Sequence, residues 1–309
     1  MKIVYMGTPD FSVLPLKKLI ENYDVVGVVT QPDKEVGRKK EIKYSKVKEI
    51  ALENNLKIFQ PTNIKTEYSE IIDLNPDIII TCAYGQIIPK ELLDYPKYGC
   101  INIHASLLPK LRGGSPIHKA IIDGYDKTGV TIMYMDEKMD SGDIIYQEEI
   151  EIEEDDTAGS LFDKLSVLGS NMIIDILPSI INGTNKRIKQ NEDEVTYAYN
   201  ITREEEKIDF NKSTKDVYNK IRGLYPWPVG YALFDDKKVK IYSAKIGEST
   251  KDAIPGEIIN IYKDSIGIKT LDGEIKILEL QFEGKKRTLV KDYLNGVQNK
   301  DDLIKKVFK

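Results

Sequence analysis

The sequence predicts an α/β fold with a mostly parallel sheet, followed by a smaller domain built as a β-barrel. In the first half, several short runs are apolar on both faces and alternate with helical patterns, which is typical of a parallel sheet covered on both sides. After Gly183 the pattern changes to short strand candidates separated by turns, which favours a small barrel such as the oligonucleotide/oligosaccharide-binding (OB) type. A chain of 309 residues is long enough for two domains.

The strands and helices of the first half can be placed in order. Residues 2–6 form the first strand, which a turn and a helical pattern follow up to about residue 22. Further strands are expected at residues 24–30, 57–59, 77–82 and 99–104, and a polar loop is expected at 31–43. Further helices are expected at residues 45–54, 116–123 and 157–181; the second begins with a proline, which suits a first helical turn. Residues 131–135 and 143–147 are expected to pair as strands around the turn Met139–Gly142.

A polar, charged segment without sustained periodicity, residues 185–207, is typical of an interdomain linker. It divides the chain into an N-terminal domain, residues 1–184, and a C-terminal domain, residues 208–309. The C-terminal domain is expected to have a helix at 214–222 and short strands at residues 231–234, 239–243, 256–262, 266–270 and 274–282. Its segment Pro226–Pro228 carries the only tryptophan of the chain, which is expected to anchor packing.

The composition is that of a soluble globular protein, with 41% hydrophobic and 31% charged residues. Two cysteines and two histidines cannot build a standard zinc site, so no metal is expected. Cys82 and Cys100 lie in apolar strand-like runs and are expected to be buried free thiols, which fits a reducing cytoplasm. No apolar run approaches the ~18 residues needed to span a membrane, and the N-terminus enters a strand at once, unlike a signal peptide. We therefore expect a cytoplasmic protein without membrane contact.

Charge is unevenly distributed along the chain. The formal net charge of −5 argues against bulk attraction to nucleic acid but leaves room for local basic patches. Residues 37–48 hold six basic residues and one acidic residue, and residues 284–309 hold eight basic and three acidic residues, so each segment has a local charge of +5. Residues 148–156 are almost all acidic. The first segment either holds phosphates or is a solvated charged surface; composition favours neither interpretation.

The strand Cys100–His104 carries two polar residues, spaced two apart, at the point where it enters a Pro- and Gly-rich loop. Alternate side chains of a strand share a face, so Asn102 and His104 point the same way at a strand end, where open α/β sheets place their ligand sites. A neutral imidazole is a usable general base, an amide can donate to a developing oxyanion, and the Asp140 carboxylate can orient the ring. The alternative is that both residues are satisfied polar groups and that Asp140 is an ordinary turn residue.

Two further loops follow strand ends, at residues 83–89 and 106–116. The second has prolines and glycines that fix an irregular backbone able to present free N–H and C=O groups to a ligand. Either loop can instead be an ordinary connection. The turn Gly7-Thr8-Pro9 lacks the further glycines of a dinucleotide fingerprint, which argues against a nicotinamide-dependent dehydrogenase.

Taken together, these motifs resemble the methionyl-tRNA formyltransferases over essentially the whole chain. The Asn-x-His pair, the loop Ser106–Pro109 and the turn Met139–Asp143 are shared by folate-dependent formyltransferases generally. More specific are the motifs at residues 6–11, 30–33 with Gly37 and Arg38, and 226–228. Residues 39–45 depart from the family's usual Gly-Lys-Lys and Pro-Ser-Pro pattern, although the basic character of the loop is kept.

The resemblance implies a Rossmann-like formyltransferase fold with a C-terminal OB-like, tRNA-binding domain, in a monomeric protein of translation initiation. It implies transfer of the formyl group of 10-formyltetrahydrofolate to the α-amino group of methionyl-initiator tRNA, without a metal or a nicotinamide. Asn102 would stabilise the oxyanion, His104 would assist proton removal or stabilise charge, and Asp140 would hold His104. The folate would contact Tyr84, Gly85, Ile87, Ile88, Ser106, Leu107, Leu108 and Pro109. The tRNA would contact Arg38, Lys39, Lys40, Lys43, Lys285, Lys286 and Arg287.

The sequence also allows two alternatives to formylation of methionyl-tRNA. A formyltransferase acting on an amino sugar nucleotide shares the Asn-x-His pair, the Ser106–Pro109 loop and the aspartate, whereas the Arg38 loop and the basic C-terminal segment favour tRNA. A non-catalytic RNA-binding protein on the same scaffold is disfavoured because Asn102, His104 and Asp140 are all present.

Overall fold

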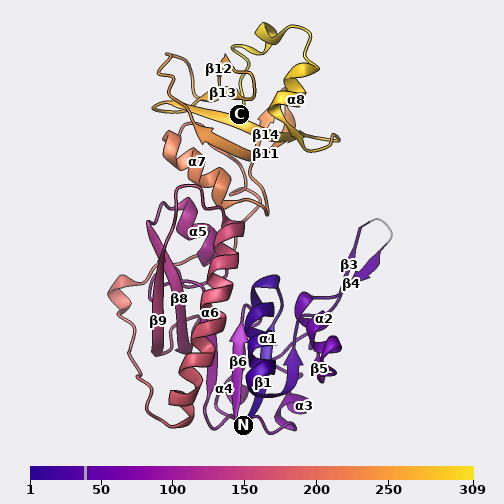
Figure 1. Cartoon of the computed structure of the whole chain (residues 1–309), viewed down its shortest axis with the longest axis vertical. Helices are drawn as coiled ribbons and strands as arrows, with labels where there is room; N and C mark the ends of the chain where they lie inside the picture. Colours follow the sequence, from indigo (N-terminus) through magenta and orange to yellow (C-terminus); the bar gives the residue numbers. More distant parts are fainter. Residues whose placement is uncertain (38–39) are drawn as a thin grey trace. The chain divides into compact units, whose positions relative to one another are not determined.

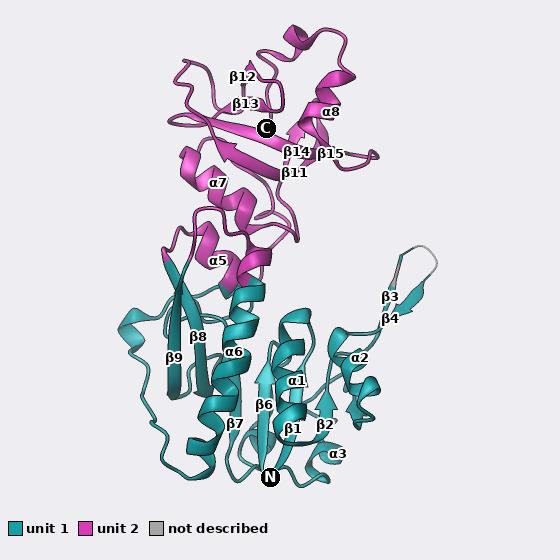
Figure 2. Ribbon diagram, viewed as in Figure 1, with its two compact units in different colours: residues 1–116, 127–151, 162–199 teal, residues 117–126, 152–161, 200–309 magenta. Residues whose placement is uncertain are grey.

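The computed structural model describes residues 1–37 and 40–309, in two compact units. Unit 1 comprises residues 1–116, 127–151 and 162–199, and unit 2 comprises residues 117–126, 152–161 and 200–309 (Figure 2). Segment 185–199 packs in unit 1, where Ile188 forms an isolated bridge with Ile144 and Tyr197 forms one with Arg112.

Unit 1 is built around a sheet whose strand order is β5-β2-β1-β6-β7-β8-β9 within the described residues. The first five strands of this order are parallel: β5 (Ile58–Phe59), β2 (Asp24–Val29), β1 (Lys2–Gly7), β6 (Ile78–Cys82) and β7 (Cys100–His104). The last two are β8 (Lys127–Tyr134) and β9 (Ile144–Glu151), which pair antiparallel with each other and place β8 antiparallel to β7. The predicted mostly parallel sheet and the predicted strand pair are both confirmed (Figure 1).

Helices lie against this sheet on both sides, as an apolar, fully buried set of strands requires. Those of unit 1 are α1 (Val13–Asn22), α2 (Lys46–Glu53), α3 (Ser69–Ile72), α4 (Lys90–Leu93) and the part of α6 (Ala158–Ile181) from residue 162 onward, with short 3₁₀ turns at Asp10–Ser12 and Glu192–Glu194. Helix α5 (Pro116–Ile122), apart from its first residue, and the start of α6 belong to unit 2. The Ser45 hydroxyl caps α2 by accepting a hydrogen bond from the Lys48 amide. At Gly169, α6 approaches Ile103 of β7 and Val130 of β8 so closely that a β-carbon would collide with Ile103.

Helix α6 corrects one statement made from the sequence, that no apolar run approaches membrane-spanning length. By length and composition, its 24 residues pass that test. Its apolar residues recur every three to four positions, and Leu165, Ile173 and Leu177 are fully buried. The part of α6 in unit 1, residues 162–181, is therefore a core helix of this fold.

A second correction concerns residues 31–43, expected to form a polar loop. They contain a hairpin of β3 (Lys34–Val36) and β4 (Glu41–Lys43), in which Lys34 pairs with Lys43 and Glu35 with Ile42. Each strand has only one apolar residue, so the sequence lacks the alternation of apolar and polar residues that predicts a strand.

Unit 2 contains an antiparallel sheet of order β10-β11-β14-β13-β12, with β15 paired to β14. Its strands are β10 (Tyr231–Phe234), β11 (Lys237–Ile246), β12 (Ile258–Ile261), β13 (Ile266–Lys269), β14 (Glu274–Phe282) and β15 (Thr288–Leu289). Besides α5 and the start of α6, it contains the helices α7 (Thr214–Gly223) and α8 (Val290–Asn295) and a 3₁₀ turn at Lys300–Leu303. The predicted OB-like domain is confirmed, its sheet is antiparallel, and α8 is an element that the sequence did not predict.

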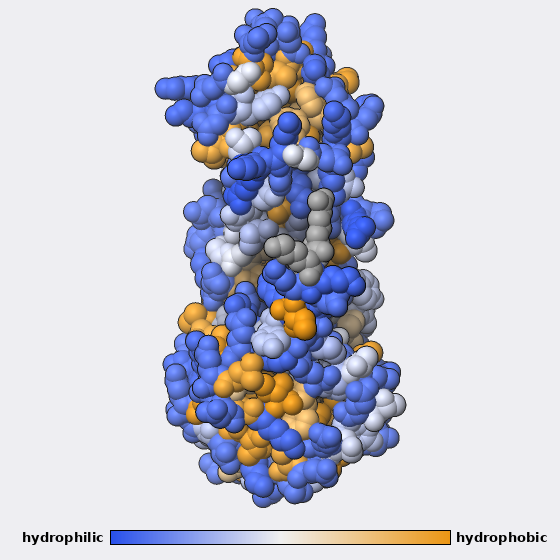
Figure 3. Space-filling view, turned by 90° about the vertical axis from the view of Figure 1, so that its right-hand side faces the viewer, coloured by the Kyte–Doolittle hydropathy of each residue, from blue (hydrophilic) through white to orange (hydrophobic). Residues whose placement is uncertain are grey.

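The cores of the two units are separately apolar, and hydrophilic residues cover most of the face drawn in Figure 3, with apolar areas between them. In unit 2, alternate residues of β13 and β14, such as Ile266, Ile268, Ile275 and Ile277, enter a core that α7 also covers.

Trp227 is 71% exposed, which corrects the expectation that this side chain anchors packing. It contacts His118, whose ring it meets edge-on at 5.9 Å between ring centres and whose Nε2 atom lies 3.0 Å from the Trp227 carbonyl.

Candidate active site

Three polar side chains from separate parts of the chain meet at the carboxyl end of β7. Asn102 and His104 lie two residues apart on that strand, and Asp140 lies in the turn between β8 and β9. The Asn102 Nδ2 atom is 3.4 Å from Asp140 Oδ1, and the His104 Nδ1 atom is 3.7 Å from the same oxygen. The side chains of His104 and Asp140 are only 6% and 16% exposed, so the structure brings the three predicted residues together in a largely desolvated cluster.

The hydrogen bond of the His104 ring fixes which nitrogen is free. Its Nε2 atom lies 3.1 Å from the Leu111 carbonyl oxygen, and a carbonyl can only accept. Nε2 therefore carries the hydrogen, and in the neutral ring Nδ1 is left with the lone pair that faces Asp140. A proton taken up by His104 goes to Nδ1, next to a carboxylate that stabilises the resulting positive charge.

The amide of Asn102 is oriented by its neighbour on β6. Thr81, which pairs with Asn102 across the two strands, has its hydroxyl 2.8 Å from Asn102 Oδ1. The Asn102 NH₂ group consequently faces Asp140 and is oriented as a donor.

The turn that carries Asp140 is conformationally demanding. Asp140 has a positive φ of 50°, and a side chain at Gly142 would collide with the Tyr134 carbonyl. The Asp140 carboxylate is held by the Gly113 N–H, which donates to Oδ2 at 2.8 Å. The Gln190 amide also binds this turn, through the carbonyls of Asp140 and Gly142. Gln190 and the Gly113 amide were not identified from the sequence, because neither residue type signals such a role.

The residues expected to line a folate site divide into buried and exposed groups. Tyr84, Ile88, Ser106 and Leu108 are buried, and the Leu108 side chain packs with Met133 and Ile144. Burial raises the pKa of the Tyr84 hydroxyl. Gly85 and Ile87 are exposed, Ile87 to 67%, and Leu107 and Pro109 are partly buried. The exposed members leave apolar surface on the loop that follows β6.

The basic residues expected to contact tRNA also differ from one another. Arg38 and Lys39 lie outside the described residues. Lys40 and Lys43 are exposed on the β3–β4 hairpin, and the Lys40 ammonium lies 3.4 Å from Glu35. Lys285 and Lys286 are exposed after β14.

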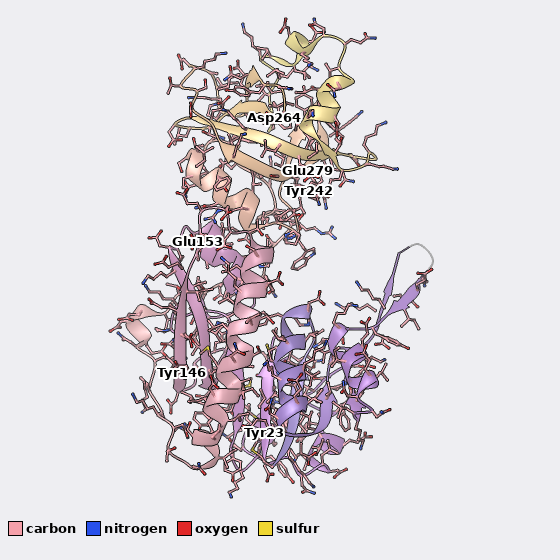
Figure 4. All side chains as sticks on the ribbon, in the orientation of Figure 1. Tyr23, Tyr146, Glu153, Tyr242, Asp264 and Glu279 are labelled. Atoms are coloured by element: carbon pink, nitrogen blue, oxygen red, sulfur yellow. The ribbon has the colours of Figure 1, made fainter. Side chains whose placement is uncertain are left out.

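Arg287 is engaged within unit 2. Its guanidinium donates to both Glu279 oxygens and lies 4.2 Å from the Tyr242 ring centre. Figure 4 shows Tyr242 and Glu279 on the adjacent strands β11 and β14. The hydrogen bonds to Glu279 raise the pKa of Arg287 further.

The remaining reactive groups lie elsewhere. Cys82 and Cys100 are buried free thiols, as expected, and burial raises the pKa of the Cys82 thiol to about 12. Burial lowers the pKa of His118, the second histidine, which belongs to unit 2. The described residues contain no group of three or more His, Cys, Asp or Glu side chains arranged to hold a metal ion.

An amide donor, an imidazole with a free nitrogen and a carboxylate around one point suit acyl transfer to an amine, in which an oxyanion forms and a proton must leave. Comparison with known proteins identifies the family that carries this site. Residues 1–177 match the formyl transferase family and residues 200–298 match its C-terminal domain. The methionyl-tRNA formyltransferase of Bacillus thuringiensis subsp. konkukian (strain 97-27) is 52% identical over 96% of both chains. The chain belongs to the methionyl-tRNA formyltransferase family.

Solved structures support the fold of this methionyl-tRNA formyltransferase family member. An N-formyltransferase from Helicobacter canadensis, solved with folinic acid and dTDP-3-aminofucose, has a TM-score of 0.67 at 23% identity, over 90% of this chain and 98% of its own. HypX from Aquifex aeolicus, in complex with tetrahydrofolic acid, has a TM-score of 0.66 at 19% identity, over 96% of this chain and 47% of its own. At these identities the likeness establishes the fold alone.

Proposed function

We propose that this protein transfers the formyl group of 10-formyltetrahydrofolate to the α-amino group of methionine carried by initiator tRNA. The observation that carries the proposal is the meeting of Asn102, His104 and Asp140 at one strand end, in a chain 52% identical to a methionyl-tRNA formyltransferase. The proposal makes the protein a cytoplasmic enzyme of translation initiation that acts as a monomer, without metal or membrane.

The roles of the three residues follow from their geometry. The attacking amine bonds to the formyl carbon, and the carbonyl electrons move onto oxygen, where the Asn102 NH₂ group donates to the oxyanion. The proton released by the amine goes to His104 Nδ1, and Asp140 stabilises the imidazolium. When the oxyanion collapses, the bond from the formyl carbon to the folate N10 breaks, and that nitrogen leaves with the proton from His104.

The two substrates would use different surfaces. For the folate we propose the exposed and partly buried residues Gly85, Ile87, Leu107 and Pro109, supported from behind by the buried Tyr84, Ile88, Ser106 and Leu108. For the tRNA backbone we propose the loop from Arg38 to Lys43 and the pair Lys285 and Lys286. Among the described members, Lys40, Lys43, Lys285 and Lys286 are exposed and can reach phosphates. Arg287, held by Glu279, would contribute less charge than the two lysines.

The division into a catalytic domain, 1–184, a linker, 185–207, and a tRNA-binding domain, 208–309, belongs to the same proposal. It is supported by the family matches, which end at residue 177 and resume at residue 200.

The test is a choice of acceptor. The protein is incubated with 10-formyltetrahydrofolate and with methionyl-initiator tRNA or, separately, with amino sugar nucleotides. We expect formyl-methionyl-tRNA, detected by its resistance to deacylation or by mass spectrometry. Formylation of an amino sugar nucleotide with untouched methionyl-tRNA would instead assign the sugar reaction.

A further inference from the structure

The side chain of Gln190 connects the Asp140 turn to the guanidinium of Arg112. Its Nε2 atom donates to the Asp140 carbonyl at 2.8 Å and to the Gly142 carbonyl at 2.9 Å. Its Oε1 atom accepts from Arg112 Nε at 3.1 Å and from Arg112 Nη2 at 2.9 Å. Each hydrogen of the NH₂ group and each lone pair of the oxygen is thereby used.

These partners require a glutamine. The two carbonyls can only accept, and a guanidinium can only donate, so the group between them must offer donors on one side and an acceptor on the other. Glutamate keeps the acceptor but places a negatively charged oxygen against two carbonyl oxygens. Methionine has a similar length and makes neither set of bonds.

Both ends of this connection lead to Asp140. On one side, Gln190 binds the main chain of Asp140 itself, whose φ of 50° is uncommon for a residue with a side chain. On the other side, Gln190 binds the guanidinium of Arg112, which is 3% exposed, and the next residue, Gly113, donates its N–H to the Asp140 carboxylate. One amide therefore fixes both the backbone of Asp140 and the segment that holds its carboxylate.

The segment containing Gln190 is itself anchored in unit 1. Ile188 exchanges backbone hydrogen bonds with Ile144 at 2.8 and 2.9 Å. Arg112 donates its N–H to the Thr196 carbonyl and accepts from the Ala198 N–H through its own carbonyl. Gln190 is thus held between two backbone pairings, which limits its freedom and favours accurate positioning.

We infer that Gln190 is a positioning residue for formyl transfer, acting with Arg112 to hold the Asp140 carboxylate against His104 and Asn102. The inference rests on the proposed function. Its consequence is that loss of the Gln190 amide lowers kcat, whereas the KM values for both substrates change little, because Gln190 acts through Asp140 and touches neither substrate.

The experiment compares Gln190→Met, Gln190→Glu and the control Glu192→Gln in the full chain. Glu192 accepts from the same guanidinium at 2.8 Å, but its side chain is 72% exposed and, within the described residues, forms no hydrogen bond with Asp140 or Gly142. Because a displacement of about 1 Å in an active site can cost ~100-fold, we expect kcat to fall about 100-fold in both Gln190 variants and less than about threefold in the control. Melting temperatures are recorded to establish that each variant is folded.

Gln190→Glu keeps the Arg112 contact and so separates positioning from stability. A folded Gln190→Glu protein with wild-type kcat would overturn the inference, as would a pair of folded variants whose losses appear only in KM.

A second readout does not depend on activity. The Gly113 amide proton should shift upfield and lose exchange protection in Gln190→Met, while the Leu108 amide, which donates to Thr131 Oγ1, should not. An unchanged Gly113 resonance would overturn the inference even if the protein proved to formylate another acceptor. Conversely, a shifted Gly113 resonance in a protein that does not formylate methionyl-tRNA would refute the proposed function but support the positioning role of Gln190.

Discussion

The tautomer of the neutral His104 ring is set by one backbone carbonyl. Since Leu111 accepts from Nε2, the free nitrogen is the one that faces Asp140, and the residue has a defined place to store a proton. The Asp140 carboxylate at 3.7 Å is beyond direct hydrogen-bond distance, so its contribution in this geometry is mainly electrostatic.

His104→Ala removes the proposed proton acceptor and leaves the proposed oxyanion donor, Asn102, in place. We expect kcat to fall about 10²- to 10⁴-fold, the range usual for loss of a general base. Binding of methionyl-tRNA, measured by filter retention, should stay within about threefold, because His104 is 6% exposed and offers almost no binding surface. Formylation at the wild-type rate would remove His104 from the mechanism.

The thiols provide a test of burial that is independent of catalysis. Burial raises the pKa of Cys82 from its ordinary value of 9.0 to about 12, and raises that of Cys100 as well. The folded thiols therefore stay protonated at pH 8, and iodoacetamide should label neither until the chain unfolds.

The sign of the accompanying pH effect follows from the raised pKa. The folded state binds these protons more tightly than the unfolded state, so the contribution to stability is complete below pH 9 and is lost as pH rises toward 12. Rapid alkylation of native protein at pH 8 would contradict the buried geometry.

The helices and strands that could be predicted from the sequence are those in which apolar residues recur at a regular spacing. Asn102 and His104 could be placed on one face of a strand because side chains alternate, and the long apolar helix 158–181 was expected at 157–181. The β3–β4 hairpin was missed because its strands are charged on both faces.

The meeting of Asp140 with β7 was an expectation that sequence alone could not establish, since it depends on how β8 and β9 fold back. Gln190 could not be foreseen at all, since it lies in a polar stretch without periodicity and acts through bonds to a distant turn.

Three consecutive basic residues after β14 differ in whether they form an ion pair. Lys285 and Lys286 are exposed, whereas Arg287 is bound to Glu279 beside Tyr242. We expect Lys285→Ala combined with Lys286→Ala to weaken tRNA binding and to reduce the salt dependence of log K by about 1 to 2, as loss of two phosphate contacts predicts.

Arg287→Ala is the matched comparison for that double variant. It should lower the melting temperature by removing a cross-strand pair but change the salt slope by less than about 0.5. Equal salt slopes in the wild type and the double lysine variant would exclude this segment from the tRNA footprint.

At the scale of the whole molecule, the chain must bind a polyanion although its own net charge is −5. An acidic protein gains no general attraction to tRNA, so we propose that binding relies on the two basic segments, residues 37–48 and 284–309, each with a charge of +5. Such contacts displace counterions, whereas the folate site proposed near Ile87 and Pro109 is apolar in its exposed parts.

Raising the salt concentration from 50 to 200 mM should therefore increase KM for methionyl-tRNA steeply, by about tenfold or more if several phosphates are contacted, with KM for the folate nearly constant. Initial rates at saturating concentrations of the other substrate provide both values. If the two KM values rose in parallel, the salt would be acting on the protein as a whole, and the division of the substrates between a basic surface and an apolar one would be wrong.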